Sequence, residues 1–117
     1  MNKRKIGSKW EEEAALFLSG EGLFVKERNF SCRFGEIDII ASDGIWTVFV
    51  EVKYRKTAAT GHPEEAVSVA KAKKISKVAD FYRVCRKMPI DAPIRFDVVA
   101  IEGSDIRWYK NAFPYTN

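Results

Sequence analysis

The sequence predicts an α/β fold in which a β-sheet is flanked by helices. Apolar residues recur at helical spacing in two segments, and runs rich in β-branched and aromatic residues lie between and after them. The predicted order is helix, three strands, helix and strand, with one further strand possible at the end. With 117 residues, 46% of them hydrophobic, the chain can bury a core without disulfide or metal staples. We therefore expect a single domain over residues 1–117.

The first helix is predicted to begin at Ser8. Its hydroxyl can cap the helix, and Glu11 completes the Ser-x-x-Glu capping box. The helix should end near Gly20, because glycine readily adopts the left-handed turn that closes a helix. Three strands rich in β-branched and aromatic residues follow, Phe24 to Phe30, Glu36 to Ala41 and Trp46 to Arg55. A turn signal at residues 42–44 joins the last two strands into a predicted β-hairpin.

The second helix is predicted to begin at Pro63. Proline suits the first turn of a helix, and the two glutamates that follow it suit the positive end of the helix dipole. This helix should run to about Arg86. An alternating apolar run then predicts a strand from Arg95 to Ile101, and Ile106 to Lys110 is a candidate for a last strand.

The two cysteines and the start of the chain bear on where the protein works. Cys32 and Cys85 match no zinc or redox spacing, so we interpret them as reduced thiols of an intracellular protein. Trp10 is followed by three glutamates rather than by the apolar stretch of a signal peptide, and no segment is long enough to span a bilayer. We expect a cytoplasmic protein without a membrane partner.

The charge of the chain suggests an anionic partner. The net charge is +4, and Lys and Arg are dense in residues 53–56 and 71–77. Such clusters suit the phosphate backbone of nucleic acid, although a solvated lysine face on a helix is an alternative for the second cluster. The single histidine, His62, excludes a histidine-rich zinc centre and leaves serine or cysteine hydrolase schemes without support.

The hairpin contains acidic residues in otherwise apolar strands. Because alternate side chains of a strand point to opposite faces, one face of each strand is predicted to be acidic. In the first hairpin strand this face carries Glu36, Asp38 and Ile40, opposite Ile37, Ile39 and Ala41. In the second it carries Phe49, Glu51 and Lys53, opposite Val48, Val50 and Val52. Asp38 and Glu51 should therefore meet, either as an ion pair with Lys53 or as ligands of a metal.

Glu11 is the third candidate ligand. It heads an apolar helical stripe formed by Ala14, Ala15 and Leu18, although the capping box also explains a glutamate here. If Glu11, Asp38 and Glu51 converge, their repulsion at about 4 Å is on the order of 4 kcal/mol per pair. One lysine cannot relieve this, whereas Mg²⁺, or Mn²⁺ in its place, prefers such oxygen ligands. Lys71 continues a second apolar stripe, and is interpreted either as a phosphate contact or as a lysine at the edge of the core.

These residues resemble a known family. Residues 35–40, Gly-Glu-Ile-Asp-Ile-Ile, and residues 49–53, Phe-Val-Glu-Val-Lys, resemble the PD-(D/E)XK nuclease superfamily and, within it, the bacterial YraN family of uncharacterised proteins. The likeness extends to Glu11 in the first helix, Lys71 in the second, and residues 95–99 and 111–113 near the end. The superfamily often has Pro before the aspartate where this chain has Ile37, a variation that the YraN pattern tolerates.

The resemblance implies a restriction endonuclease-like fold, with a central mixed β-sheet flanked by helices, similar to Holliday-junction resolvases. It implies that Asp38 and Glu51 are metal ligands, that Glu11 is a ligand directly or through water, and that Lys53 positions the attacking water. Asp38, Glu51 and Lys53 would then be the catalytic residues of a Mg²⁺-dependent endonuclease.

Nucleic acid, with DNA the first candidate, is the expected partner. We expect Arg33, Arg55, Lys56 and Lys71 to contact its backbone, and Lys53 to stay charged beside carboxylates. A homodimer is expected because so small a domain offers little surface for a duplex. The alternative is a non-catalytic nucleic-acid-binding or adaptor protein that retains the nuclease fold.

Overall fold

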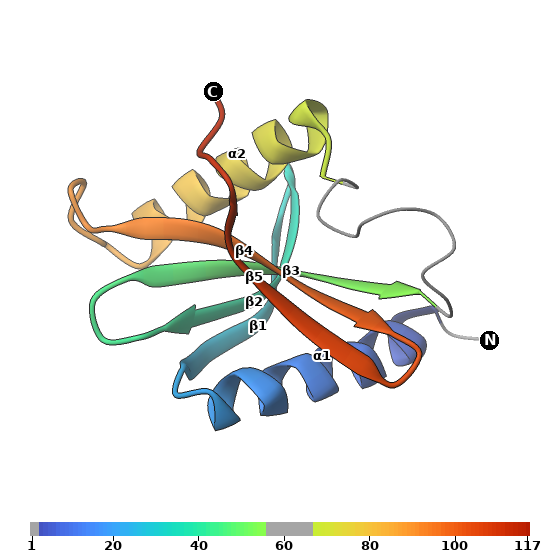
Figure 1. Cartoon of the computed structure of the whole chain (residues 1–117). Coiled ribbons are helices and arrows are strands. Elements are labelled where there is room, and N and C mark those ends of the chain that lie inside the picture. Colours follow the sequence, from blue (N-terminus) through green and yellow to red (C-terminus); the bar gives the residue numbers. More distant parts are fainter. Residues whose placement is uncertain (1–2, 56–66) are drawn as a thin grey trace.

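The predicted order of helices and strands is confirmed, including the last strand. A computed structural model describes residues 3–55 and 67–117, with side chains from Lys9 onward (Figure 1). The elements are α1 (Lys3–Gly20), β1 (Phe24–Cys32), β2 (Gly35–Ser42), β3 (Thr47–Arg55), α2 (Val69–Cys85), β4 (Ile94–Glu102) and β5 (Asp105–Phe113). The fold class is therefore α/β, as expected.

The five strands form one mixed sheet in the order β1-β2-β3-β4-β5. All neighbouring strands are antiparallel except β3 and β4, which are parallel. A parallel pair requires a crossover connection, and α2 lies within the connection between β3 and β4. Figure 1 shows α1 on one face of the sheet and α2 on the other. The sheet is thus central and flanked by helices, as the family resemblance implies.

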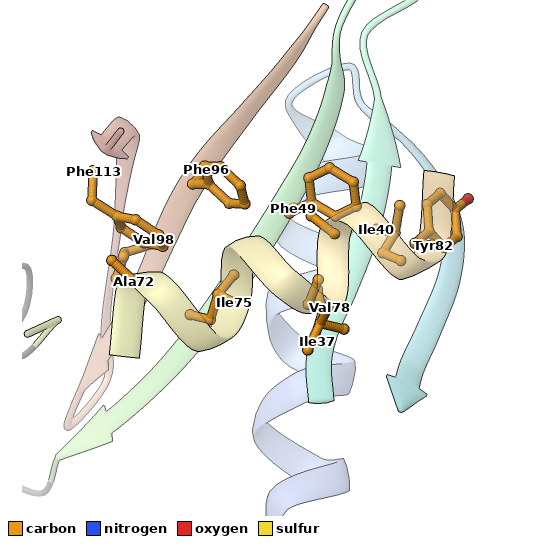
Figure 2. Packing of buried hydrophobic residues seen from close by; sticks show 11 residues of the cluster. Ile37, Ile40, Phe49, Ala72, Ile75, Val78, Tyr82, Phe96, Val98 and Phe113 are labelled. Atoms are coloured by element: carbon orange, nitrogen blue, oxygen red, sulfur yellow. The ribbon is translucent and has the colours of Figure 1, made fainter. Parts of the chain in front are cut away.

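Each helix covers its own apolar core. On the α2 side, Ile37, Ile40 and Phe49 of the sheet and Tyr82 of α2 belong to one buried cluster, which Figure 2 shows where the helix packs against the strands. On the α1 side, the second cluster joins the helix to the sheet through Ala14, Ala15, Leu18, Ile39, Ala41, Val48, Val50, Val99 and Ile101. These two cores fix both helices against the sheet, and with them the side chains near the start of α2 and in the middle of α1.

The predicted start of the first helix is wrong. The helix begins at Lys3, so Ser8 lies within α1 rather than at its N-cap. Lys and Arg have high helix propensity, which allows the basic residues before Ser8 to extend the helix toward the N-terminus. The capping box therefore does not account for Glu11, because a residue inside a helix has no cap role.

The second helix is not continuous from Pro63 as predicted. Residues 67–68 are not helical and α2 begins at Val69, whereas Pro63 lies outside the described residues. Ser68 is the N-cap, with φ −73° and ψ 165°, and its Oγ accepts a hydrogen bond of 3.1 Å from the backbone N–H of Lys71. Serine side chains compete for backbone hydrogen bonds and so favour such cap positions over helix interiors.

Strict alternation fails in β2. Ile37 was expected on the same face as Ile39, yet it packs in the α2-side cluster with Ile40, whereas Ile39 packs in the α1-side cluster. The change of face falls at Asp38, between the two isoleucines. The pairing of β2 with β3 runs from Ser42 to Ile39, so this irregularity lies next to the last paired residue.

Candidate metal centre

Asp38 lies where the ladder between β2 and β3 stops. The last backbone pair is Ile39 with Val50. Two residues further along β3, the backbone N–H of Val52 donates a hydrogen bond of 2.8 Å to Oδ2 of Asp38. The carboxylate thus takes the place of a backbone acceptor at the point where the strands separate. This contact fixes Asp38 between the two faces of the sheet.

Three carboxylates converge at this point. Oxygen atoms of Glu11, Glu36 and Asp38 all lie within 4.8 Å of one another, which is close enough to share one cation. Glu11 comes from α1, whereas Glu36 and Asp38 come from β2. The structure therefore brings Glu11 and Asp38 together, as expected. Glu36 was not expected to be a ligand, although its position two residues before Asp38 was the signal that could have found it.

Glu51 approaches the same place from the other face. It is outside the group of three, but with Glu36 and Asp38 it lines a cavity of about 500 Å³. Its side chain is only 11% exposed, and Oε1 lies 3.1 Å from Nζ of Lys71 and 3.8 Å from Nζ of Lys53. Asp38 and Glu51 thus line one cavity, as expected, and Lys53 contacts Glu51 beside it.

The pKa values of Asp38 and Glu11 are raised. That of Asp38 is raised to about 8 by burial first and then by the charges of Glu51, Glu11 and Glu36, against the hydrogen bond from Val52. The pKa of Glu11 is also raised, first by burial and then by the charge of Glu36, against a hydrogen bond with Asn29. A bound divalent cation would relieve this repulsion, and a set of carboxylate oxygens without His or Cys suits Mg²⁺ or Mn²⁺.

The two lysines next to Glu51 differ. The pKa of Lys53 is lowered, first by burial and then by its neighbour Lys71, and the carboxylates only partly compensate. As expected, the carboxylates raise the pKa of Lys53 and so favour its charged form. The net pKa of Lys53 is nevertheless lowered, which was not expected. The pKa of Lys71 is raised, because the Glu51 carboxylate and hydrogen bonds outweigh the lowering effect of burial.

The expected nucleic-acid contacts lie in different places. Lys71 lines the cavity, together with Lys74 and Ser68. Arg33 is exposed and its guanidinium lies 4.8 Å from the ring of Phe34, which also lines the cavity. Arg55 is at the end of β3, and Lys56 lies outside the described residues.

A larger hollow of about 650 Å³ lies elsewhere, beside the C-terminal half of α2. Its lining is mostly apolar, and Asp80 is its single carboxylate, which accepts a hydrogen bond of 2.6 Å from the Tyr115 hydroxyl. A hollow with one engaged carboxylate is a poor cation site, so the smaller acidic cavity is the better candidate for chemistry.

Asp97 is a buried acid that we did not single out as a site residue. Its side chain is fully buried on β4. It accepts hydrogen bonds from Nε of Arg95 at 3.0 Å, from the Trp108 indole at 2.9 Å and from the backbone N–H of Asn111 at 2.9 Å. Asn111 has a left-handed φ of 51°, close to the irregularity in the pairing of β4 with β5. Asp97 is therefore a structural residue that holds the end of β5.

The fold and the acidic cavity define a small α/β protein with a cluster of carboxylates where strands β2 and β3 separate. Within the described residues, no helix combines the length and the apolar character needed to cross a bilayer. A family model described as "Uncharacterised protein family UPF0102" matches residues 10–101.

Named relatives cover nearly the whole chain. It is 45% identical over 113 residues to a UPF0102 protein of Lachnoclostridium phytofermentans, covering 97% of this chain and 96% of that protein. It is 42% identical over 119 residues to a UPF0102 protein of Caldicellulosiruptor saccharolyticus, covering 97% of this chain and 100% of that protein. The chain belongs to the UPF0102 family, which confirms its resemblance to YraN-like proteins.

Proposed function

We propose that this protein is a Mg²⁺-dependent endonuclease that hydrolyses phosphodiester bonds of nucleic acid and resembles Holliday-junction resolvases. The observation that carries the proposal is the convergence of Glu11, Glu36 and Asp38 near Glu51, which lines a cavity with Lys71 and has Lys53 at 3.8 Å. Ionised carboxylates within 4.8 Å repel one another unless a cation or a proton joins them, and a divalent cation would join all three acids at once.

The proposed ligands are Asp38 and Glu51, with Glu11 directly or through water, and Glu36 joins them on geometric grounds. Mg²⁺, or Mn²⁺ in its place, would supply a Lewis acid for the phosphate and lower the pKa of a bound water. Asp38 is held for this role by its hydrogen bond from the backbone N–H of Val52. Asp38, Glu51 and Lys53 are the catalytic residues of the proposal.

Lys53 orients the water and stabilises negative charge on the transition state. Burial and the neighbouring Lys71 lower its pKa, so the ammonium group gives up its proton more easily than that of a free lysine. Lys71, Arg33, Arg55 and Lys56 are proposed to bind the phosphate backbone. Such contacts give an affinity that depends on salt and only slightly on sequence.

The proposal is tested by cation binding first and cleavage second. Calorimetry with Mn²⁺ should give a saturable heat that Asp38→Asn and Glu51→Gln weaken strongly, whereas Asp91→Asn, an exposed acid in the connection before β4, should leave it unchanged. Purified protein is then incubated with Mn²⁺ and branched, single-stranded or duplex DNA. Cleavage that persists in both Asp38→Asn and Glu51→Gln would show that another site is responsible.

The same assays address the adaptor alternative. Nucleic-acid binding without cleavage, under any divalent metal, would favour a non-catalytic binding or adaptor protein over a nuclease. We also propose a cytoplasmic location, because Cys32 and Cys85 match no zinc or redox spacing and suit reduced thiols. We further propose that two copies act together, which sedimentation with and without DNA would test.

A further inference from the structure

The ion pair between Lys71 and Glu51 ties α2 to the acidic cavity. Nζ of Lys71 lies 3.1 Å from Oε1 of Glu51, and Lys53 approaches the same oxygen at 3.8 Å. One carboxylate oxygen therefore faces two ammonium groups. Because Glu51 is only 11% exposed, its charge requires a nearby cation, and Lys71 is the nearer of the two.

A divalent cation and Lys71 have conflicting demands on Glu51. A carboxylate that ligates a metal gives its oxygen to that metal, and a doubly charged ion next to an ammonium group repels it. Glu51 therefore interacts better with either partner alone than with both at once. Removal of one competitor should strengthen the binding of the other, because coupling between two binding events is reciprocal.

Lys71 is better placed to move than Lys53. The Lys71 side chain is 40% exposed, whereas that of Lys53 is 21% exposed and starts from a strand within the sheet. The backbone of Lys71 is fixed, since its N–H donates to Oγ of the N-cap Ser68. A fixed backbone with a long, half-exposed side chain allows the ammonium group to swing while the helix stays in place.

The acidic cavity is the place into which the Lys71 side chain would move. Glu36, Asp38 and Glu51 line one part of it, and Ser68, Ala70, Lys71 and Lys74 from the start of α2 line another. A phosphate group in this cavity would lie between the acids and the first turn of α2. An ammonium group released from Glu51 can reach such a phosphate without any movement of the backbone.

Resting on the proposed function, we propose that Lys71 acts as an exchangeable cation: it neutralises Glu51 until a divalent metal binds, and then leaves Glu51 to hold a phosphate oxygen of the nucleic acid. The Glu51 charge raises the pKa of Lys71 against the effect of burial, which agrees with an ammonium group held at Glu51. Metal and nucleic acid are thereby coupled through one side chain, since Lys71 becomes available to phosphate only after the metal has taken Glu51.

The test compares Lys71→Gln with Lys74→Gln. Both remove one positive charge from the lining of the same cavity, but the ion pairs of Glu51 within the described residues are made with Lys71 and Lys53. Calorimetry with Mn²⁺ should show that Lys71→Gln binds the metal about tenfold more tightly than the wild type. Lys74→Gln should change the affinity by less than about threefold, since a solvated charge is screened.

A second arm measures nucleic acid. In Ca²⁺, used as a non-cleaving probe metal, Lys71→Gln should weaken DNA binding about tenfold, and without metal it should have little effect, because Lys71 is then engaged by Glu51. Equal Mn²⁺ affinities of Lys71→Gln and wild type would overturn the proposed exchange of Lys71 but would not contradict the metal site. The absence of any saturable Mn²⁺ heat in the wild type would instead overturn the proposed function.

A measurement on the unaltered protein covers the case in which Lys71→Gln fails to fold. The ¹⁵N-lysine Nζ resonance of Lys71, assigned with Lys71→Arg, is followed during titration with Mg²⁺. Loss of the ion pair predicts a saturable shift of the Lys71 resonance with a much smaller change at Lys74. A Lys71 resonance that does not move while Mg²⁺ saturates the site would overturn the exchange.

Discussion

The carboxylate of Asp38 accepts a hydrogen bond from the backbone of Val52, a residue of the neighbouring strand, at 2.8 Å. This contact explains why the acids converge where they do. Ladder pairing between β2 and β3 ends at Ile39 and Val50, and the Asp38 side chain occupies the next acceptor position. Glu11, from α1, lies within 4.8 Å of Asp38 there, and the charge of Glu51, from β3, also acts on Asp38.

The first prediction concerns the stability of the metal-free protein. The pKa of Asp38 is raised from 3.8 to about 8, so the protonated form is favoured in the folded state. Its contribution to stability is complete below the unfolded pKa and is lost as the pH rises through about 8. In EDTA at pH 8.5, Asp38→Asn should therefore be more stable than the wild type, by on the order of 2 kcal/mol.

Urea unfolding at pH 5 and pH 8.5 measures this difference. The asparagine carbonyl can still accept from Val52, so the local structure is preserved. The advantage of Asp38→Asn should shrink at pH 5, and saturating Mn²⁺ at pH 8.5 should reverse it, since only the wild type gains from metal. An asparagine variant less stable than the wild type at both pH values in EDTA would contradict the prediction.

Much of this site follows from sequence pattern, and some of it does not. The hairpin and its acids are predictable because strand propensity and alternation are local properties, and Glu11 is marked by its place on an apolar helical stripe. Alternation nevertheless misplaced Ile37, because a side-chain acceptor at Asp38 interrupts the ladder, which no periodic rule anticipates. Ser68 was likewise missed as the cap of α2, because the preceding Pro63 gave the stronger local signal.

A second prediction concerns Asp97. Removing Asp97 leaves the part-buried Arg95 with only the more distant Asp43 as a partner, and also leaves the indole of Trp108 without its acceptor. Asp97→Ala should lower the free energy of unfolding by about 3–5 kcal/mol. Asp43→Ala is the matched control, because Asp43 contacts the same arginine at 3.4 Å from a more exposed position. Thermal unfolding followed by circular dichroism would reveal similar losses in both variants if the burial of Asp97 were unimportant.

The pH dependence of the protein's stability below neutral pH should be determined in part by Glu27. Arg86 donates two hydrogen bonds to this carboxylate, at 2.6 and 2.8 Å, and lowers its pKa. A lowered pKa gives stability that is present above the unfolded value of 4.5 and is lost as the pH falls through the folded value. The Tm difference between wild type and Glu27→Gln should thus be largest near pH 7 and vanish toward pH 3. Glu21→Gln, at an exposed position after α1, should show no such trend.

The last prediction separates metal binding from catalysis at Lys53. Lys53 contacts Glu51 at 3.8 Å, more loosely than Lys71 does, so it contributes less to neutralising the ligand. If it orients water and stabilises transition-state charge, Lys53→Ala should lower cleavage about 10²–10³-fold while Mn²⁺ affinity changes only a few-fold. Single-turnover cleavage and calorimetry on the same preparation give both values. Lys53→Arg should not restore the rate, because its forked guanidinium cannot replace a compact ammonium group in this part-buried position. A loss of rate that matches a loss of metal affinity would instead make Lys53 a residue that supports the metal site.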